Sequence, residues 1–489
     1  MSATTLALPA PAQAVASAYS TRARKLAVSV VALAFLMDLM DSTILTIALP
    51  TIQRHMHASL SAVNWMAAAY TLAFAVLLVA GGRMGDRFGY RRLFVIGVAA
   101  FMGASILVGL AWSPAALIAA RLLQGASAAL MVPQVLSMVQ LLYGPEERVA
   151  INGMLGGLGM LATTLAPVVT ALLIRASVAG LSWRPIFLIN VPICLAALAL
   201  ASRHLPLARS TRALRLDLGG TILVVAATGL LVFPLIEGRD LGWPAWAYAM
   251  IAASILLFGL LARTQRRAER RGGSPLITPG LFRHRSFSVG LVVSLLLFAT
   301  VAAFALTFSL TLQLGHGFSA IHAVLTALFL TAGLIASAGA GSKKAIPILG
   351  RWSLTIGAVL AAAGTAMLGL IAAHSGQALT SWQLAPGLFI LGAGMGMVMV
   401  PLVPFILSSV DSDDAGSASG IASAVQQLGG AIGIAVIGAV FFPELKAGGD
   451  YGHAFMSGVW LQLALLVAAA ALTLFLPRRI AAEAYRPHV

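Results

Sequence analysis

Long apolar segments, most of them about 20 residues in length, recur along the whole 489-residue chain and alternate with shorter polar segments. An α-helix needs about 20 mostly apolar residues to cross a bilayer. The pattern therefore predicts an all-α integral membrane protein with about 14 transmembrane helices. The predicted spans lie near 27–49, 64–82, 93–112, 115–140, 150–174, 185–202, 218–236, 245–262, 287–312, 321–340, 352–373, 385–408, 418–442 and 456–477.

Basic residues are distributed unevenly over the predicted loops. With the N-terminus in the cytoplasm, 25 of the 31 Lys and Arg residues fall on the cytoplasmic side, five fall outside, and Arg121 falls inside a span. An excess of Lys and Arg marks the cytoplasmic loops of membrane proteins. The count predicts a multi-pass protein of the cytoplasmic (inner) membrane with both termini in the cytoplasm. Four tryptophans near span ends are expected at the membrane interfaces: Trp65, Trp183, Trp243 and Trp246.

The composition agrees with a bilayer environment, because 60% of the residues are hydrophobic and only 9% are charged. Soluble proteins carry about 25% charged residues. The net charge of +16 would otherwise suggest a nucleic-acid partner, but the basic residues lie in short loops between spans, so we expect none. The single cysteine, Cys194, cannot form an internal disulfide. We expect a monomer whose main partner is the lipid bilayer.

Two loops indicate that the chain is built from two related halves. The segment GGRMGDRFGYRR (81–92) follows the second predicted span, and GAGSKKAIPILGR (339–351) follows the tenth. Internal repeats of this kind are typical of secondary transporters. The expected organisation is a flexible cytoplasmic tail (1–24), an N-terminal six-helix bundle (25–204), two inserted helices (205–264), a basic cytoplasmic linker (265–286), a C-terminal six-helix bundle (287–478) and a cytoplasmic tail (479–489).

Two acidic residues, Asp38 and Asp41, fall near the middle of the first predicted span. An aspartate at that depth costs about 2.5–3.5 kcal/mol on insertion scales, and acids inside membranes usually mark an ion or substrate path. Their three-residue spacing puts both on one helix face, where burial and like charge favour protonation of one of them. Our hypothesis makes Asp41 the main protonation site, while Asp38 tunes it or meets a cationic substrate in a central cavity. The alternative is a structural pair satisfied by neighbouring helices.

Arg121 is the one basic residue inside a predicted span. Its guanidinium keeps its proton in proteins, so it needs an acidic partner or water. It is a structural ion pair, or a side chain that reaches toward the membrane edge, or an electrostatic control on the nearby acids.

The segment 82–92 predicts a tight, charged cytoplasmic turn. Its glycines allow close approach and unusual backbone angles, and Asp86 could bind arginines or helix-end amides and so latch two helices together. The alternative is an ordinary basic loop.

These motifs resemble those of the major facilitator superfamily, and in particular its fourteen-spanner drug/proton antiporter branch. Segment 82–92 resembles the signature between helices 2 and 3, segment 117–129 the helix-4 motif, and segment 40–50 the helix-1 motif. Segments 183–192 and 415–433 resemble further features of the branch. The resemblance implies a major facilitator fold of two six-helix bundles plus two inserted helices. It also implies proton coupling by Asp41, Asp38 and Arg121, a helix-4 motif completed by Gln124 and Gly125, and a cytoplasmic gate formed by Gly82, Gly85, Asp86, Arg87, Gly89, Arg91 and Arg92.

The helix-5 motif departs from the pattern of exporters. The family carries Gly-Pro followed by a glycine pair, whereas this chain reads APVVTA at 166–171, so that Pro167 is kept and the glycines are absent. The direction of transport is therefore less firmly implied than the family. Glycines earlier on the same helix, including Gly153 and Gly159, are expected to supply the missing close packing.

Together these features predict a proton-coupled antiporter that exports hydrophobic or lipophilic-cation drugs by alternating access. The chain has no phosphate-binding Gly-x-x-x-x-Gly-Lys-Ser/Thr loop and no hydrolase motif. We therefore expect no enzyme activity, no metal and no cofactor, with the proton gradient as the energy source. The alternatives are a dedicated metabolite or self-resistance transporter of the same fold, and a membrane receptor or scaffold that transports nothing.

Overall fold

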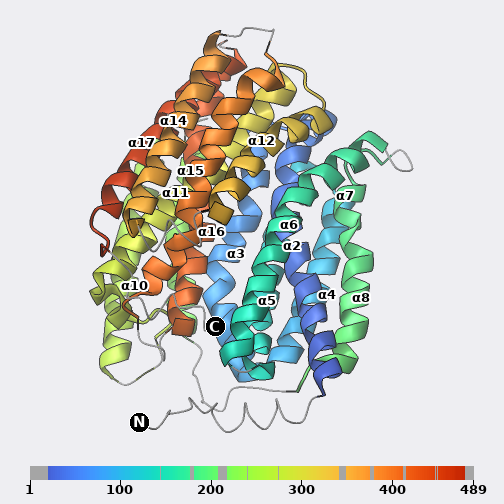
Figure 1. Cartoon of the computed structure of the whole chain (residues 1–489), viewed down its shortest axis with the longest axis vertical. Helices are drawn as coiled ribbons and strands as arrows, with labels where there is room; N and C mark the ends of the chain where they lie inside the picture. The colour runs from blue at the N-terminus through green and yellow to red at the C-terminus, as the bar shows by residue number, and fades with distance from the viewer. Residues whose placement is uncertain are drawn as a thin grey trace.

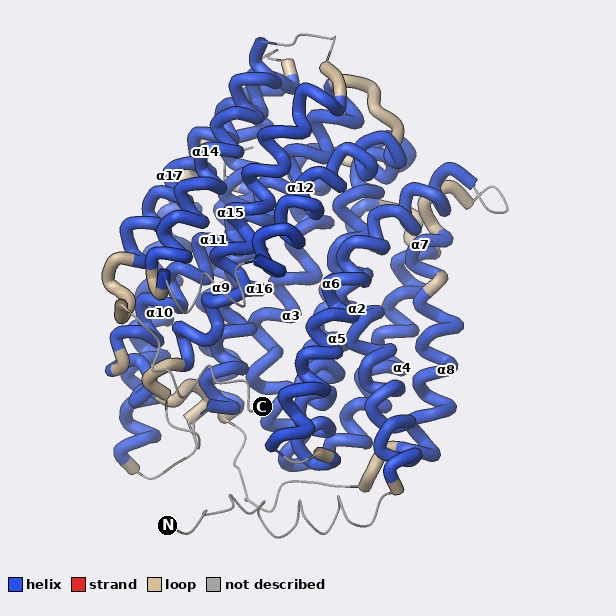
Figure 2. Tube along the Cα trace, viewed as in Figure 1, coloured by secondary structure: helices blue, strands red, loops and turns tan. Residues whose placement is uncertain are grey.

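The computed structural model describes residues 20–143, 145–176, 181–207, 217–238, 241–271, 273, 275–340, 349–374, 379–410, 415–446, 448 and 450–478. Within these ranges the chain is almost entirely helical and contains no strand, as Figure 2 shows. The expected C-terminal tail (479–489) and most of the second basic loop (341–348) lie outside the described residues. The expected N-terminal tail overlaps them only slightly, since α2 already begins at Thr21.

The first half of the chain contributes α2 (Thr21–Met56), α3 (Leu60–Phe88), α4 (Tyr90–Gly109), α5 (Pro114–Leu142), α6 (Pro145–Ala176), α7 (Pro185–Leu188) and α8 (Asn190–His204). Next come α9 (Leu218–Glu237), α10 (Ala245–Arg270) and the short η2 (Pro279–Arg283). The second half contributes α11 (Arg285–Leu310), η3 (Thr311–Gly315), α12 (Ala320–Ala340), α14 (Trp352–His374), α15 (Ser381–Leu407), α16 (Ala415–Lys446) and α17 (Tyr451–Thr473).

Thirteen of the described helical segments are long and apolar enough to cross a membrane. The fifth predicted span falls in α6, whose described apolar part, Leu165–Ala176, is shorter. The predicted all-α membrane fold is confirmed. Several helices begin at a residue whose side chain accepts a bond from a backbone N–H of the first turn, which satisfies one of the donors left free there; Ser59, Ser113 and Asp450 do so for α3, α5 and α17.

The helices form two groups, which lie side by side in Figure 1. Helices α2 to α8 pack on one another, as do α11 to α17, and α3 and α16 meet where the groups join. Helices α9 and α10 pack together, and α9 contacts both α3 and α16. The exact domain boundaries expected from the sequence stay predictions.

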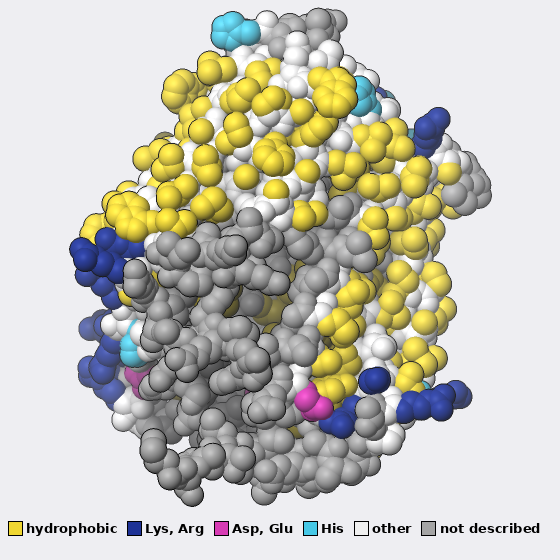
Figure 3. Space-filling model, viewed as in Figure 1, with side chains coloured by type: hydrophobic (Ala, Val, Ile, Leu, Met, Phe, Trp, Pro, Cys, Tyr) yellow, Lys and Arg dark blue, Asp and Glu magenta, His cyan; other side chains and the backbone are white. Residues whose placement is uncertain are grey.

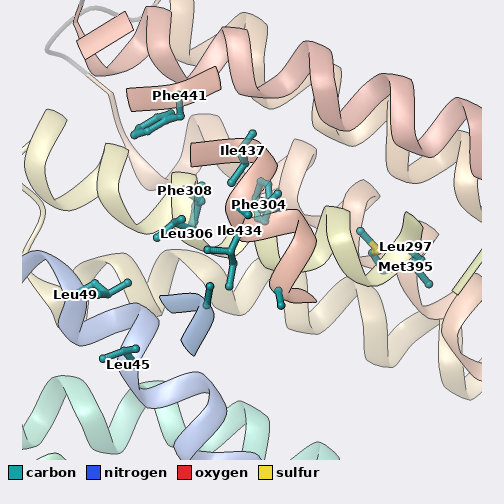
Figure 4. Packing of buried hydrophobic residues seen from close by; sticks show 14 of the residues in the cluster. Leu45, Leu49, Leu297, Phe304, Leu306, Phe308, Met395, Ile434, Ile437 and Phe441 are labelled. Carbon is teal, nitrogen blue, oxygen red and sulfur yellow. The ribbon is translucent and has the colours of Figure 1, made fainter. Parts of the chain in front are cut away.

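One cluster of buried apolar residues joins the two groups. Leu45 and Leu49 of α2 belong to it with Phe308 of α11 and with Ile437 and Phe441 of α16, and Figure 4 shows these side chains gathered between their helices. The halves are therefore closed against each other around the second half of α2.

A second apolar cluster contains the first half of α2. Its buried members, such as Met37, Phe94 and Cys194, all come from α2 to α8 and the residues adjoining them. Among the described residues, Ala424 is the one member of the second group that packs against it. Toward the Thr21 end of α2, the first group thus keeps an apolar core largely of its own.

One expectation is corrected by the structure, and two others gain structural detail. The predicted turn at 82–92 is mostly helical: α3 continues to Phe88, and Gly89, with φ 97°, alone separates it from α4. Helix α10 continues to Arg270, into the segment expected as a linker (265–286), through residues that are mostly good helix formers. Trp183, expected near an interface, is fully buried, and its ring lies at 81° to that of Phe187 with centroids 6.1 Å apart.

The described surface matches a protein surrounded by lipid. Hydrophobic side chains cover much of the upper and right-hand parts of the face drawn in Figure 3, and Lys and Arg lie at its margins, mainly along the left edge and at the lower right. Leu256, Ile255 and Ile222 of the α9–α10 pair are each more than half exposed, which an apolar solvent makes favourable.

Candidate functional site

A buried ion pair lies at the centre of the first helix group. Arg121 of α5 is 1% exposed and donates from Nη1 to Oδ2 of Asp41 on α2, which is fully buried, over 2.5 Å. Removing a carboxylate and a guanidinium from water is costly unless each is paired and hydrogen-bonded. The predicted residues Asp41 and Arg121 are thus brought into direct contact.

Neutral side chains complete the surroundings of the Asp41 carboxylate. Gln124 Nε2 donates to Asp41 Oδ1 over 2.9 Å, and Asn190 Nδ2 donates to the same oxygen over 2.8 Å. Gln124 also accepts from Arg121 Nη1 at 2.9 Å. The Ser105 hydroxyl accepts from Gln124 at 2.9 Å and from Asn190 at 3.3 Å. Asp41 therefore accepts three hydrogen bonds, and the one from the Arg121 guanidinium is charge-assisted.

Asp38 lies one helical turn before Asp41 and has a much poorer set of partners. It is 3% exposed and accepts a hydrogen bond from the hydroxyl of Tyr70 on α3. The ring of Tyr70 in turn lies under the Arg121 guanidinium, 4.5 Å from its carbon to the ring centroid. Tyr70 thus contacts both Asp38 and Arg121.

The charges of this cluster do not cancel when both acids are ionised. One guanidinium faces two carboxylates, and the direct contact goes to Asp41. The described network takes its side chains from α2, α3, α4, α5 and α8, and none from α9 to α17. A single proton on Asp38 would make the group neutral overall, which a low-dielectric interior favours.

Glycines of the motifs bring α3 and α5 close together around the cluster. A Cβ on Gly125 would collide with the backbone of Tyr70, and a Cβ on Gly81 would collide with the backbone of Ala129. Such contact requires residues without side chains. Gly125 of the predicted helix-4 motif therefore holds Tyr70 against Arg121.

The predicted gate motif lies where α3 meets α4 and α5. Asp86 accepts from the hydroxyl of Tyr90 at 2.8 Å, so it binds within the motif rather than to the backbone amides that we expected as one possibility. Gly85 faces Gln134, whose amide donates to the carbonyl of Gly81 at 3.0 Å, and Gly82 faces Pro133.

The basic residues of the motif bind backbone carbonyls or cover rings. Arg91 donates to the carbonyl of Ser202 in the last turn of α8 and to that of Leu205 just after it. Arg87 lies over Phe88, and Arg92 is exposed. Arg83, just inside the motif, donates to the carbonyl of Pro275 in the segment between α10 and η2.

Asp217 fixes the same segment from the start of α9. Its carboxylate accepts from Gln265 Nε2 at 2.6 Å, from Gly220 N at 2.7 Å and from Leu276 N at 3.3 Å. Partial burial raises the pKa of Asp217, but these hydrogen bonds together with Arg83 outweigh it and hold the pKa below its ordinary value. The inserted pair α9–α10 is therefore tied to the linker and, through it, to α3.

The other end of α9 is tied to α3 as well. The Glu237 carboxylate accepts from Ser61 Oγ and Trp65 Nε1, each at 2.7 Å. Trp65 also packs on Phe233, with ring centroids 5.9 Å apart. Trp65, expected as an interface anchor, thus has a specific partner.

Sequence reasoning named Asp38, Asp41, Arg121, Gln124 and Gly125, and the structure brings all five into one site. Pro167 lies inside α6, partly exposed and with no contact to the cluster that the structure describes. Gly159 of the same helix packs against Leu39 and Phe35 of α2. The side chain position of Gly153 lies outside the described residues.

Sequence reasoning missed Tyr70, Ser105 and Asn190. Asn190 belongs to segment 183–192, which the resemblance had marked without giving it a role. A single neutral polar residue inside an apolar run is less conspicuous in the sequence than a charged one. The motif at 183–192 was therefore the only sequence feature that could have indicated Asn190.

Comparison with known proteins gives a consistent result. The family described as Major Facilitator Superfamily matches residues 31–434. The chain is 41% identical over 422 residues to the "Probable actinorhodin transporter" of Streptomyces coelicolor, covering 85% of this chain and 72% of that protein. It is 34% identical over 415 residues to the "Tetracenomycin C resistance and export protein" of Streptomyces glaucescens (83% and 74%). It is 31% identical over 428 residues to the "Multidrug resistance protein Stp" of Mycobacterium tuberculosis (85% and 75%).

Proposed function

The chain belongs to the Major Facilitator Superfamily, and from this premise we propose that it exports an antibiotic-like hydrophobic compound across the cytoplasmic membrane in exchange for protons. The two helix groups supply the moving halves of alternating access. The proposal keeps both termini in the cytoplasm, as the distribution of basic residues predicts.

One observation carries the proton-coupling part of the proposal, namely the buried cluster of two carboxylates and one guanidinium. Asp38 and Asp41 are 3% and 0% exposed, and Arg121 is 1% exposed. Buried ionisable groups in a membrane protein are costly and mark ion paths. A transporter that takes up a proton from one side needs such a group, able to change charge away from bulk water.

The contacts support a division of roles that differs from our expectation from the sequence. The Asp41 carboxylate accepts hydrogen bonds from Arg121, Gln124 and Asn190, so all its described partners are donors. Asp38 has the Tyr70 hydroxyl as its described partner. In this conformation Asp38 carries the exchanged proton, and the Asp41–Arg121 pair is the fixed counter-charge beside it.

The relatives bear on the substrate. The names of two of them give one compound each, and the name of a third gives multidrug resistance. A dedicated self-resistance exporter is therefore a second candidate, with the same fold and the same proton cluster but a narrow substrate range. The breadth of the substrate panel separates the two.

The test uses the purified protein in liposomes with an imposed pH gradient and a pH-sensitive dye inside. Lipophilic cations, neutral antibiotics, organic acids, actinorhodin and tetracenomycin C are added in turn to wild type, Asp38→Asn, Asp41→Asn and a control, Asp450→Asn, which keeps a capping side chain at the start of α17. We expect compound-induced proton movement in wild type and the control, and none in Asp38→Asn. Full proton movement in Asp38→Asn would refute the assignment, and silence of the wild type across the panel would refute the antiport itself.

A further inference from the structure

Beyond the proton cluster, hydrogen bonds cross directly between the two halves where the apolar cluster closes them. Ser309 Oγ, near the end of α11, donates to the backbone carbonyl of Thr46 on α2 at 2.9 Å. Gln313 Nε2 donates to the neighbouring carbonyl of Ile47 at 3.3 Å and to Ser309 Oγ at 3.0 Å. A connected chain of donors from the second half thus ends on two backbone carbonyls of the first.

The acceptor on α2 is created by a proline. In an α-helix the carbonyl of residue 46 would accept from the N–H of residue 50, but residue 50 is Pro50, which has no N–H. The proline ring also pushes against that carbonyl. Inside a membrane protein a carbonyl without a donor is costly, and neighbouring helices often supply the missing bond. Ser309 does this for Thr46.

The two donors, Ser309 and Gln313, lie at the end of α11 and in the π-helical turn η3 that follows it. The α-helix changes at Thr311–Gly315 into a π-helical turn, in which the N–H of His316 bonds to the carbonyl of Thr311 at 3.0 Å. Ser309 and Gln313 are each 3% exposed, and their four-residue spacing puts them on one face. Single π-turns inside helices are frequent at functional sites.

We propose that Ser309 and Gln313 are positioning residues of the transport cycle. When the end of the molecule at the Met56 end of α2 is closed, Ser309 holds the carbonyl of Thr46 that Pro50 leaves free, and Gln313 holds Ser309 and the carbonyl of Ile47. When that end opens, both side chains release these carbonyls. The inference rests on alternating access in the proposed function. Thr46 follows Asp41 by five residues on the same continuous helix, α2. The bonds that close this end therefore act on the helix that carries both carboxylates.

The test measures the opening of this end without using transport. In a Cys194→Ser background, spin labels are attached at His55→Cys near the end of α2 and at His453→Cys near the start of α17, both exposed. Pulsed electron paramagnetic resonance in liposomes then gives the distribution of distances between the two labels, one on each half. The variants are Ser309→Ala, Ser309→Thr, Gln313→Ala and Pro50→Ala, together with the Pro50→Ala/Ser309→Ala double variant.

Ser309→Ala should raise the ratio of long to short distances about fivefold, which corresponds to about 1 kcal/mol for one neutral hydrogen bond. Gln313→Ala should raise it in the same direction, and Ser309→Thr, which keeps the hydroxyl, should stay close to wild type. Pro50→Ala restores an N–H for Thr46 within α2, so in that background Ser309→Ala should change the ratio less than about twofold.

The proposal is overturned if Ser309→Ala leaves the distances unchanged, if Ser309→Thr opens this end as much as Ser309→Ala, or if Ser309→Ala has the same effect in both backgrounds. Since all variants are compared at the same pH without substrate, the comparison of distances requires no proton transport. A chain that shows the predicted distances but moves no protons would remove the proposed function and leave this inference standing.

Discussion

Replacing both Asp41 and Arg121 by neutral residues should recover most of the stability that either single replacement loses, but should not recover proton coupling. Removing one partner of a buried ion pair leaves an uncompensated charge and typically costs about 3–5 kcal/mol. Both members are at most 1% exposed and lie 2.5 Å apart, so Asp41→Asn and Arg121→Gln should each reach that range. The double variant replaces both charges by neutral amides, of which Asn matches Asp in shape and Gln is shorter than Arg, and should recover all but about 1–2 kcal/mol.

The measurement is a double-mutant cycle. The free energy of unfolding of wild type, both single variants and the double variant is obtained by denaturant titration in micelles, followed by tryptophan fluorescence. The interaction term should exceed about 2 kcal/mol, because the two residues are in direct contact. The same four proteins in liposomes should show compound-induced proton movement only in wild type. Simple addition of the two single losses in the double variant would refute the pairing argument.

Three further predictions follow from single contacts. Asn190→Ala removes one donor to the Asp41 carboxylate and should lower the free energy of unfolding by about 1.5–3 kcal/mol, with slower proton exchange in liposomes. Gly125→Ala places a methyl group against the Tyr70 backbone and should cost about 1–3 kcal/mol in denaturant titration, whereas Gly103→Ala, with nothing within 4 Å, should cost nothing. The pKa of Asp217 lies below its ordinary value, so the contacts of Asp217 with the segment after α10 should be intact above about pH 4 and be lost as the pH falls through the lowered pKa. Hydrogen exchange of the Leu276 amide, measured as a function of pH, should show this loss, and Asp217→Asn should abolish the pH dependence.

The helices and their approximate positions could be predicted from the sequence because each span carries its own signal. A run of about 20 apolar residues needs no knowledge of its neighbours to be identified. Helix ends were predicted less well. The polar continuations of α3 to Phe88 and of α10 to Arg270 extend beyond the apolar core, where hydropathy gives no information. In α10 the residues are mostly good helix formers, whereas in α3 the poor helix formers Gly82 and Gly85 pack against Pro133 and Gln134 of α5.

The charged members of the site were predictable for a related reason. Asp38, Asp41 and Arg121 stand out because a charge in an apolar run is expensive. Which acid would be paired was not predictable, and our expectation for Asp41 as the proton site was made without its partners. That choice depends on α5 and α8 supplying three donors to Asp41 while α3 supplies a single hydroxyl to Asp38.

The hydrogen bonds between the two halves are the feature that the sequence alone could not predict. Pro50 is visible in the sequence, and its missing N–H could be stated at once. The partner of the carbonyl that it frees is 263 residues away, in a helix whose turn widens just beyond Ser309. A backbone group has no side-chain identity to mark it, so only the fold can show that the second half donates to it. A proline inside a spanning helix therefore predicts that a neighbouring helix donates to the carbonyl four residues earlier. In this protein the donor is Ser309, and its bond to Thr46 connects the two halves of the molecule.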